Sequence, residues 1–441
     1  MGSGREEIER GVLKRITPTA AEKEEMGRVV AELLTRISDA AHSLDISAEG
    51  MVVGSAARDT YLRSDTDIDL FLLFDPTTSR AELERQGLGI GRRVLDSIEL
   101  RYAEHPYTHG IYRGYEVDLV PCYRVPPGKR ITAVDRTPAH HEYVQKHLKG
   151  KQRDHVRLLK RFLRGLGVYG AEAAVEGFSG YLCELLILRY GSFSLLVKAA
   201  GGWRPPVTIP SGEYEFDNPL IVIDPVDPKR NVASAVSLRS FALFVEACNA
   251  YRNRPTEKFF FPEPISPWSP QQISQEMEGR GYWLAICFPT PPVVEDVLYP
   301  QVKKCARKVV ELCERYDFRI AITDCYVDKK EVLVLLGFEV SVLPSIRIHR
   351  GPPVWCREAS ERFRKKWADS YMAGERWVVD VAREYINPKR LLEQHIQGID
   401  LGPRINALKE QVEMLEGEAI IIPSYLEFLT SCFDRRPPWE R

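Results

Sequence analysis

The sequence predicts a multidomain α+β protein, and three observations support this prediction. Strand-like and helix-like runs are interspersed over about the first 130 residues, helical periodicity dominates residues 150–255, and a β-α-β-β order follows the proline-rich stretch 259–270. A length of 441 residues is ordinarily divided among roughly two to four domains. We therefore expect three domains, which comprise residues 1–140, 141–258 and 259–441.

The first domain is expected to hold a small mixed sheet flanked by helices. Apolar residues recur at helical spacing over residues 18–44. Ser79 and Glu82 have the spacing of a capping box at the start of a second long helix, and a shorter helix is expected at 55–62. The strand-like runs are 51–53, 67–74, 98–104 and 110–123.

The other two domains differ in their expected structure. The central domain is mostly helical, with long apolar-rich helices expected over 153–167, 179–200 and 234–253. The last domain opens with a β-α-β-β order over residues 281–340, which is half of a ferredoxin-like fold and also a very common structural unit. Helical segments are expected from there to the C-terminus.

Composition places the chain among ordinary globular proteins and argues against several other classes. The hydrophobic share is 44%, the charged share 28% and the net charge −1. No pair of the nine cysteines has C-x-x-C spacing, which argues against a zinc ribbon and indicates reduced thiols. No apolar run approaches the length of a membrane span, and the charged N-terminal segment lacks the apolar core of a signal peptide. We expect a cytoplasmic protein that has no membrane segment.

Two acidic residues stand at the start of the apolar strand 67–74. Asp67 and Asp69 are two positions apart, so their side chains point to the same face of a strand while Ile68 points to the other. Adjacent ionised carboxylates raise each other's pKa unless a cation lies between them. Mg²⁺ prefers oxygen ligands and commonly binds one or two carboxylates together with substrate phosphates. The pair therefore indicates a Mg²⁺ site, although a bare D-x-D is more often a turn or capping feature.

A third acid would complete a site with two ions, which lie about 3.5–4 Å apart in such centres. Asp118 is the best candidate because it lies in a strand-like run between Val117 and Leu119, which would otherwise bury it. Glu116, two residues earlier on the same face, is the alternative.

A glycine-serine pair precedes these acids, between a strand and the start of a helix. Gly54 permits a tight turn and the close approach of a ligand, and the N-terminus of the helix offers free N–H groups to phosphate oxygens. Ser55 adds a hydroxyl, and Arg58, one turn later, adds a fork of donors. On its own the pair would be read as an N-cap beside a solvated charge, but the nearby acids make the combination far more specific.

In combination these features resemble the polymerase-beta-like nucleotidyltransferase superfamily. More closely, several segments look like those of the archaeal-type (class I) CCA-adding enzymes, which are tRNA nucleotidyltransferases: GSAARDTYL, DIDLFLLF, RYAEHPYTHG, VDLVPCY, AVDRTPAHH, LLKRFLRGLGVYGAE, GFSGYLCELLI and DPVDPKRNVA. This resemblance runs in order to about residue 235, and beyond residue 260 it rests on the layout of the elements. It implies a catalytic head, a helical neck that recognises the base, and a body and tail that bind tRNA.

The resemblance implies a reaction and a set of residues for it. The reaction is template-independent addition and repair of the 3′-terminal CCA of tRNA from CTP and ATP, with Mg²⁺ in a two-metal transfer that releases pyrophosphate. The implied metal ligands are Asp67, Asp69 and Asp118, although the family commonly has Glu where this chain has Asp67. The implied nucleotide contacts are Ser55, Arg58, His141, Lys160, Tyr169 and Arg230. Arg230 would read the incoming base, and relatives suggest a homodimer.

Without the resemblance, several of these residues have plainer interpretations. His141 is next to His140 in the sequence and would usually belong to a surface pair, and Tyr169 could belong to the core. Lys160 lies in the basic run 146–165, where we expect leucines and phenylalanine to face the core while the cations face outward, toward phosphate. Two further basic stretches, SIRIHR and RFRKKW, are expected to bind tRNA by shape.

Two alternative functions remain open at this point. The first is another template-independent RNA nucleotidyltransferase, such as a poly(A) or terminal uridylyl transferase, which would make a long homopolymer rather than stop after three additions. The second is a catalytically dead RNA-binding paralogue. The intact set of three acids argues against the second alternative, because a cluster of like charges has no structural benefit without a cation.

Overall fold

The computed structural model describes residues 2–63, 65–102, 105–126 and 129–441. The chain forms two compact units. The first contains the residues up to Pro264 and takes in the last six residues, Arg436–Arg441, while the second is Ile265–Arg435. Each unit is described separately below.

A five-stranded mixed sheet is the framework of the first unit. Its strand order is β1-β2-β5-β4-β3. Only β2 and β5 run parallel within this sheet, and every other neighbouring pair is antiparallel. The strands are β1 (Ala48–Val52), β2 (Asp67–Phe74), β3 (Ser97–Tyr102), β4 (Pro106–Tyr112) and β5 (Tyr115–Tyr123).

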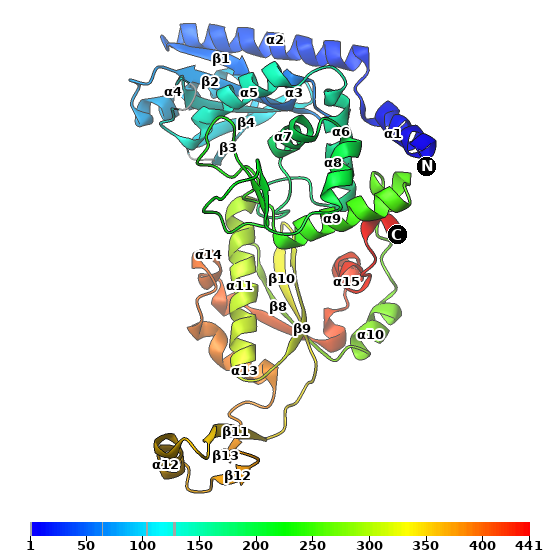
Figure 1. Ribbon diagram of the computed structural model, residues 1–441. Coiled ribbons are helices and arrows are strands. Elements are labelled where there is room, and N and C mark those ends of the chain that lie inside the picture. The colour runs from blue at the N-terminus through cyan, green and yellow to red at the C-terminus, as the bar shows by residue number, and fades with distance from the viewer. Residues whose placement is uncertain (1, 64, 103–104, 127–128) are drawn as a thin grey trace. The chain divides into compact units, whose positions relative to one another are not determined.

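Two long helices cover one face of this sheet, α2 (Ala20–Ser43) and α4 (Arg80–Val94) (Figure 1). Both begin at a capping box, and the one at Ser79 and Glu82 confirms the prediction from sequence. The expected helix at 55–62 is shorter in the structure. The helix α3 (Gly54–Arg58) ends there because Asp59 adopts a left-handed conformation, with φ of 52°. Residues 103 and 104, at the end of the expected strand 98–104, lie outside the described residues.

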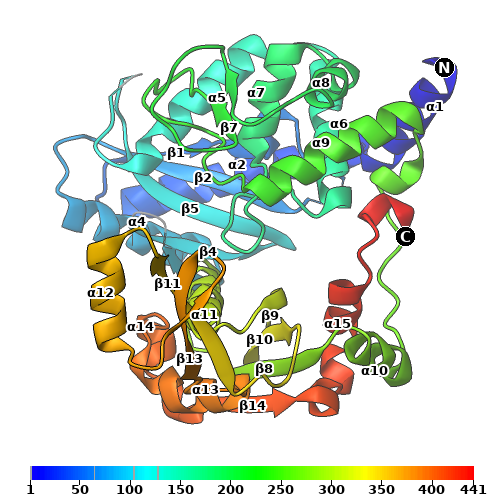
Figure 2. The same cartoon turned by 60° about the horizontal axis from the view of Figure 1, so that its bottom comes forward.

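Helices pack together in the rest of the first unit (Figure 2). Their common core is rich in aromatic rings, and Phe162 lies within 6.4 Å, between ring centroids, of five others. A short parallel pair, β6 (Val207–Ile209) and β7 (Leu220–Val222), follows α8. The helices are α1 (Gly2–Ile16), α5 (Arg136–His147), α6 (Gln152–Leu166), α7 (Gly180–Tyr190), α8 (Phe193–Ala200) and α9 (Leu238–Asn253).

The second unit completes the ferredoxin-like order of which the sequence predicted half. The four-stranded antiparallel sheet has the order β14-β8-β10-β9, in which β14 (Glu413–Glu416) supplies the fourth strand. The predicted β-α-β-β part is confirmed as β8 (Tyr282–Pro289), α11 (Glu295–Arg315), β9 (Ile320–Val327) and β10 (Glu331–Phe338).

Separate apolar cores lie on the two faces of this sheet. One core joins α11 to α13 (Pro388–His395) and α14 (Pro403–Asn406). The other joins α10 (Pro270–Glu278) to α15 (Leu426–Phe433).

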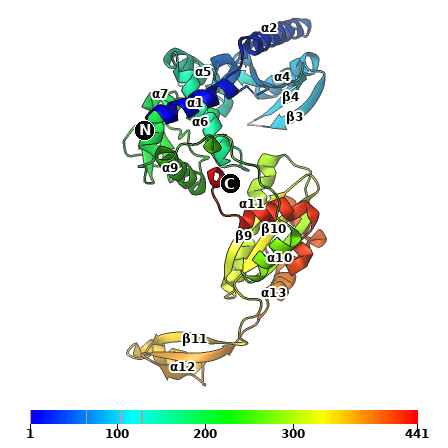
Figure 3. The same ribbon diagram turned by 90° about the vertical axis from the view of Figure 1, so that its right-hand side faces the viewer.

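The expectation that only helical segments follow residue 340 was wrong. Between β10 and α13 the chain forms a three-stranded antiparallel sheet with one helix, joined to the rest of the unit by two connecting segments (Figure 3). The strands carry many charged and exposed residues, so the sequence lacks the apolar alternation that signals a strand. The elements are β11 (Ile346–Pro353), α12 (Arg357–Lys366), β12 (Tyr371–Ala373) and β13 (Arg376–Ala382).

No single helix among the described residues has the length and apolar composition needed to cross a membrane. The pair α7 and α8 passes that test only when its two members, which are bent by 91°, are taken together.

Candidate active site

The acids predicted from sequence meet at one end of the parallel strand pair. Asp69 of β2 lies opposite Asp118 of β5, and Asp67 lies opposite Glu116. Ile68, between the two β2 acids, is buried on the other side of the strand. Parallel pairing in this register therefore brings together residues that are far apart in sequence.

The turn at Gly54 lies in close contact with one of these acids, Asp69. Gly54 has φ of 69°, and a Cβ at this position would lie 2.0 Å from Asp69 Oδ2. The Val53 N–H also donates to the Asp69 carbonyl oxygen at 3.0 Å. Glycine is required here by both the backbone conformation and the space, because any side chain would displace the carboxylate.

Burial, and secondly mutual repulsion, disfavour ionisation of two of these acids. Burial, together with the charges of Asp118 and Asp67, raises the pKa of Asp69 to about 6, despite the opposing effect of Arg58 and Lys160. Burial and the charges of neighbouring acids also raise the pKa of Asp67. The folded protein therefore holds these carboxylates in a state that a cation would stabilise.

The residues present fit a hard divalent cation by their chemistry. Three carboxylates supply only oxygen donors, which suit Mg²⁺. Among the described residues, however, no group of three or more His, Cys, Asp or Glu side chains is arranged to hold a metal ion. Asp118 accepts a hydrogen bond from His109 Nδ1 at 2.6 Å. Ligation by all three acids thus requires a side-chain rearrangement, for which Asp118 is the clearest candidate.

A buried ionic cluster lies behind the Gly54 turn. Glu184 of α7 accepts hydrogen bonds at Oε1 from Arg58 Nε, at 2.9 Å, and from Thr60 Oγ1, at 2.7 Å. Lys160 of α6 donates to the Thr60 carbonyl oxygen at 2.9 Å. Lys160 is 1% exposed and Arg58 is 9% exposed, so two of the expected nucleotide contacts are held rigidly below the surface.

The prediction that the cations of residues 146–165 face outward was therefore wrong in part. Arg157 is 1% exposed and Lys160 is also buried, both on the side of α6 that packs against the residues after α3. Arg157 Nη2 donates to the Asp59 carbonyl oxygen at 2.7 Å, and its Nε donates to the Tyr61 carbonyl oxygen at 3.0 Å. Buried carbonyl groups in this loop need donors, and these long side chains provide them.

Three further expected contacts occupy distinct surroundings. Ser55 lies in the first turn of α3, whose N-cap is Val53, so Ser55 is not itself the capping residue. His141 is buried, and burial and the charge of Arg58 lower its pKa. Burial raises the pKa of Tyr169 well above its usual value, and its ring faces the guanidinium of Arg164 at 4.9 Å.

The last expected contact, Arg230, is fixed by a buried carboxylate. Asp224 Oδ2 accepts hydrogen bonds from Arg230 Nη1 at 2.9 Å and from His140 Nε2 at 2.8 Å, and Tyr181 donates to its Oδ1 at 3.2 Å. Burial opposes ionisation of Asp224, but the hydrogen bonds from His140 and Arg230, with the charge of His140, hold its pKa well below the usual range. The rings of His140 and Tyr181 stack, with centroids 4.2 Å apart.

Sequence reasoning missed the residues that hold these contacts in place. Glu184, Asp224 and His109 each bind an expected site residue, yet none stands out by spacing. Glu184 offers the clearest signal, because it is the one acid in the apolar run YLCELLIL, where an unpaired charge would be costly.

Family profiles match three stretches of the chain. Residues 34–140 match the nucleotidyltransferase domain, 154–261 match the second domain of tRNA nucleotidyltransferase, and 280–417 match the C-terminal domain of the CCA-adding enzyme. The CCA-adding enzyme of Methanosarcina acetivorans is 42% identical, over 91% of this chain and 92% of that protein. This chain belongs to the CCA-adding enzyme family.

Other CCA-adding enzymes agree with this membership over the whole length. Those of Methanoregula boonei and Archaeoglobus fulgidus are 39% and 38% identical, over 100% and 94% of this chain and 98% and 95% of theirs. Among solved structures, Cid1 poly(U) polymerase is 12% identical with a TM-score of 0.48, over 59% of this chain and 99% of its own, which is too slight a likeness for a functional argument. As a CCA-adding enzyme, the chain is a nucleotidyltransferase of tRNA processing.

Proposed function

We propose that this CCA-adding enzyme builds and repairs the 3′-terminal CCA of tRNA from CTP and ATP without a nucleic-acid template. The observation that carries the proposal is the register of β2 and β5, which sets Asp69 beside Asp118 next to the Gly54 turn. A carboxylate pair beside a turn whose first residue, Gly54, has no side chain suits a triphosphate that arrives together with cations.

In the proposed reaction the 3′ hydroxyl of tRNA attacks the α-phosphorus of the incoming nucleotide. A bond forms between the hydroxyl oxygen and the α-phosphorus, and the bond from that phosphorus to the bridging oxygen breaks. Pyrophosphate leaves with the electron pair of the broken bond, and the hydroxyl proton passes to solvent water. Asp67, Asp69 and Asp118 are the residues that would hold Mg²⁺. When bound, these ions supply a lowered pKa for the hydroxyl and countercharge for the phosphates.

The protein's own cations are proposed to hold the triphosphate. Arg58 offers a planar fork of donors and Lys160 a compact charge, and both are fixed by the hydrogen bonds of Glu184 and Thr60. Ser55, in the first turn of the helix that carries Arg58, adds a hydroxyl. We also assign nucleotide contacts to His141, and to Tyr169 through its ring and hydroxyl.

Base selection is proposed to depend on Arg230. Cytosine and adenine differ in the donors and acceptors on their edges, so a reader must present hydrogen-bond donors at fixed positions. Asp224 accepts from Arg230 and so removes much of the rotational freedom of its side chain. The neighbouring stacked rings of His140 and Tyr181 make the support of Asp224 rigid.

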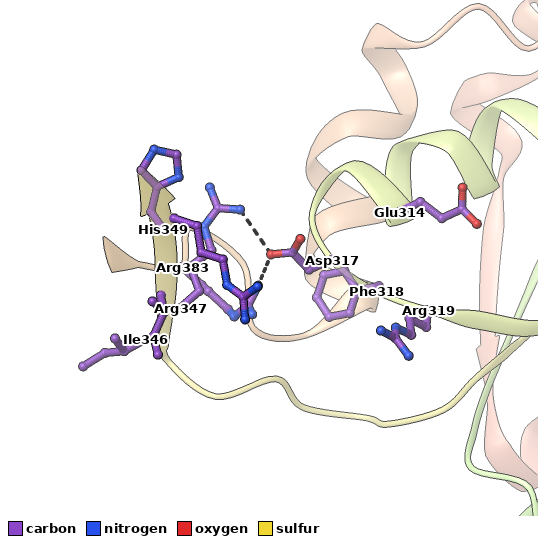
Figure 4. Close-up of a pocket in the computed structure, with 10 residues that line it drawn as sticks. Glu314, Asp317, Phe318, Arg319, Ile346, Arg347, His349 and Arg383 are labelled. Carbon is purple, nitrogen blue, oxygen red and sulfur yellow. Dashed lines mark hydrogen bonds and ion pairs between the residues drawn. The ribbon is translucent and has the colours of Figure 1, made fainter. Parts of the chain in front are cut away.

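The second unit is proposed to bind tRNA by its shape. Arginines line a cavity of about 730 Å³ between the end of α11 and the strands β11 and β13. Figure 4 shows Arg347 and Arg383 directed toward Asp317, with His349 on the same strand as Arg347. Further cations, Arg364, Lys365 and Lys366, lie in the last turn of α12. Phosphate contacts by such groups carry no sequence information, which suits a substrate class of many tRNAs.

The assignments made from sequence complete this proposal. Residues 1–140 form the catalytic head, 141–258 the neck that recognises the base, and 259–441 the body and tail that bind tRNA. The enzyme uses Mg²⁺ and acts as a homodimer in the cytoplasm.

A tRNA extension assay tests the function. Purified enzyme is incubated with tRNA that lacks CCA and with CTP alone, then with CTP and ATP, and the products are resolved at single-nucleotide length. We expect two additions with CTP alone and three with both nucleotides. A long homopolymer from a single nucleotide would refute the proposal in favour of a poly(A) or terminal uridylyl transferase, and absence of extension would indicate an inactive RNA-binding protein.

A further inference from the structure

We propose that Glu184 is a positioning residue, which orients Arg58 and keeps Lys160 charged for the triphosphate. This inference deepens the proposed function and rests on it, because it assumes that these two cations bind nucleotide. Glu184 does not touch the reacting atoms in this scheme and acts only through its neighbours.

The geometry places one carboxylate beneath three elements. Glu184 on α7 has no exposed surface, and its Oε1 accepts from Arg58 on α3 and from Thr60 in the loop that follows. The carbonyl of that same Thr60 accepts from Lys160 on α6. Displacement of Glu184 would therefore disturb both cations at once.

The hydrogen bonds of Glu184 involve only one of its two carboxylate oxygens. Glu184 Oε2 is buried and has no hydrogen-bond partner among the residues that the structure describes. The buried ion pair with Arg58, at 2.9 Å through Oε1, accounts for part of the negative charge of Glu184. The unpaired Oε2 leaves the rest of that charge for a second cation that needs it.

That need comes from Lys160, whose ammonium group is buried. Burial lowers the pKa of Lys160, and the charge of Glu184 is the largest influence that opposes this effect. The Lys160 ammonium group has three N–H donors, of which one bonds to the Thr60 carbonyl, so a nearby anion is the main influence that favours its charged form. A neutral amine would bind phosphate oxygens far less strongly.

Other titratable groups near Lys160 do not replace Glu184. The Asp65 carboxylate is already paired with Arg164 at 2.7 Å, and burial keeps the thiol of Cys183 neutral by raising its pKa to about 12. The groups whose charges interact with Lys160 are Glu184 and Cys183 of α7, Asp65 before β2, Arg58 of α3 and Asp69 of β2.

The first experiment compares CTP binding by the wild type and by Glu184→Gln, in the full chain and without RNA, across about pH 6 to 8. The substitution keeps an acceptor for Arg58 and Thr60 but removes the charge. We expect the Kd for CTP to rise several-fold at about pH 8, where loss of the Glu184 charge favours the neutral amine of Lys160, and to approach the wild-type value at about pH 6. The ratio of the two proteins cancels the titration of CTP itself.

The second experiment is a double-mutant cycle with Lys160→Met. If Glu184 acts through the charge of Lys160, Glu184→Gln adds little further loss of CTP affinity in the Lys160→Met background. The double variant also removes one buried negative charge and one buried positive charge, so it should fold even if a single variant is destabilised by an uncompensated charge. Ile187→Val, a buried change on the same helix, is the matched control and should leave CTP binding unchanged at every pH.

The outcomes separate this inference from the proposed function. A Glu184→Gln loss that is equal at all pH values, or additive with Lys160→Met, would overturn the inference and indicate a merely structural glutamate. Normal CTP binding by Glu184→Gln would overturn it as well. If the wild-type enzyme itself bound neither CTP nor ATP and extended no tRNA, the proposed function would be the part that fails.

Discussion

Replacement of Asp69 by Asn should stabilise the metal-free enzyme while it abolishes nucleotide addition. The structure raises the pKa of Asp69 from 3.8 to about 6, so the folded state disfavours its ionised form. This cost is absent below pH 3.8, grows as the pH rises through the interval up to about 6, and is complete above it. Each pKa unit corresponds to about 1.4 kcal/mol, so Asp69→Asn should gain about 3 kcal/mol near neutral pH and little at about pH 4.

Amide hydrogen exchange in β2 and β5 measures the local stability gained by Asp69→Asn. Amides of β2 and β5 are followed in EDTA at about pH 4 and about pH 7.5, with intrinsic rates corrected for pH, and Asp39→Asn on the exposed side of α2 serves as the charge control. Added Mg²⁺ should then protect the wild type but not Asp69→Asn, because only a protein that binds the ion gains stability from it. Equal protection of Asp69→Asn and the wild type at both pH values would refute the electrostatic argument. Residual incorporation of label by Asp69→Asn would refute its role in metal binding.

Three further predictions concern other parts of the molecule. Gly54→Ala should abolish nucleotide incorporation, because the new methyl group would displace the Asp69 carboxylate. Urea unfolding should also show a loss of stability of about 1–2 kcal/mol from backbone strain alone. A fully active variant would contradict the contact with Asp69. Asp224→Asn weakens the hydrogen bond that holds Arg230, and it should raise misincorporation of UTP and GTP about tenfold. The measurement is the kcat/KM for each wrong nucleotide divided by that for CTP or ATP. Unchanged ratios would exclude Arg230 as the residue that reads the base. Asp317→Asn removes the countercharge of two arginines and should tighten tRNA binding several-fold at low salt but not at high salt, by filter binding; no change would separate this cavity from RNA.

The sequence predicted the elements that follow local rules. The strand 67–74 was predicted with its observed bounds because the two acids lead directly into the continuous apolar run Leu70–Phe74, and the capping box at Ser79 is a purely local signal. The β-α-β-β order of the second unit also held, since each of its elements has a clear apolar pattern.

Features that depend on tertiary contacts could not be predicted in this way. The inward orientation of Arg157 and Lys160 is set by carbonyl groups of a distant loop, which no helical pattern reveals. The strands β11 and β13 pair with each other despite their charged residues, and only short apolar stretches such as Val378 and Val379 are buried, so no extended apolar pattern marks them in the sequence. The positions of the three acids were predictable, whereas the partners that restrain the site, such as His109 and Glu184, required the structure.

The parallel pairing of β2 and β5 has a consequence for how such an enzyme can vary. Two parallel neighbours cannot be joined by a tight turn, and here the intervening chain makes a helix and two strands before it returns. Insertions and deletions in the loops of that excursion preserve the pairing of the two strands, whereas a slip of a single residue in the ladder would set Val117 or Leu119 opposite Asp69. Evolution is therefore free to change the spacing between these acids along the chain but not the alignment of the two strands.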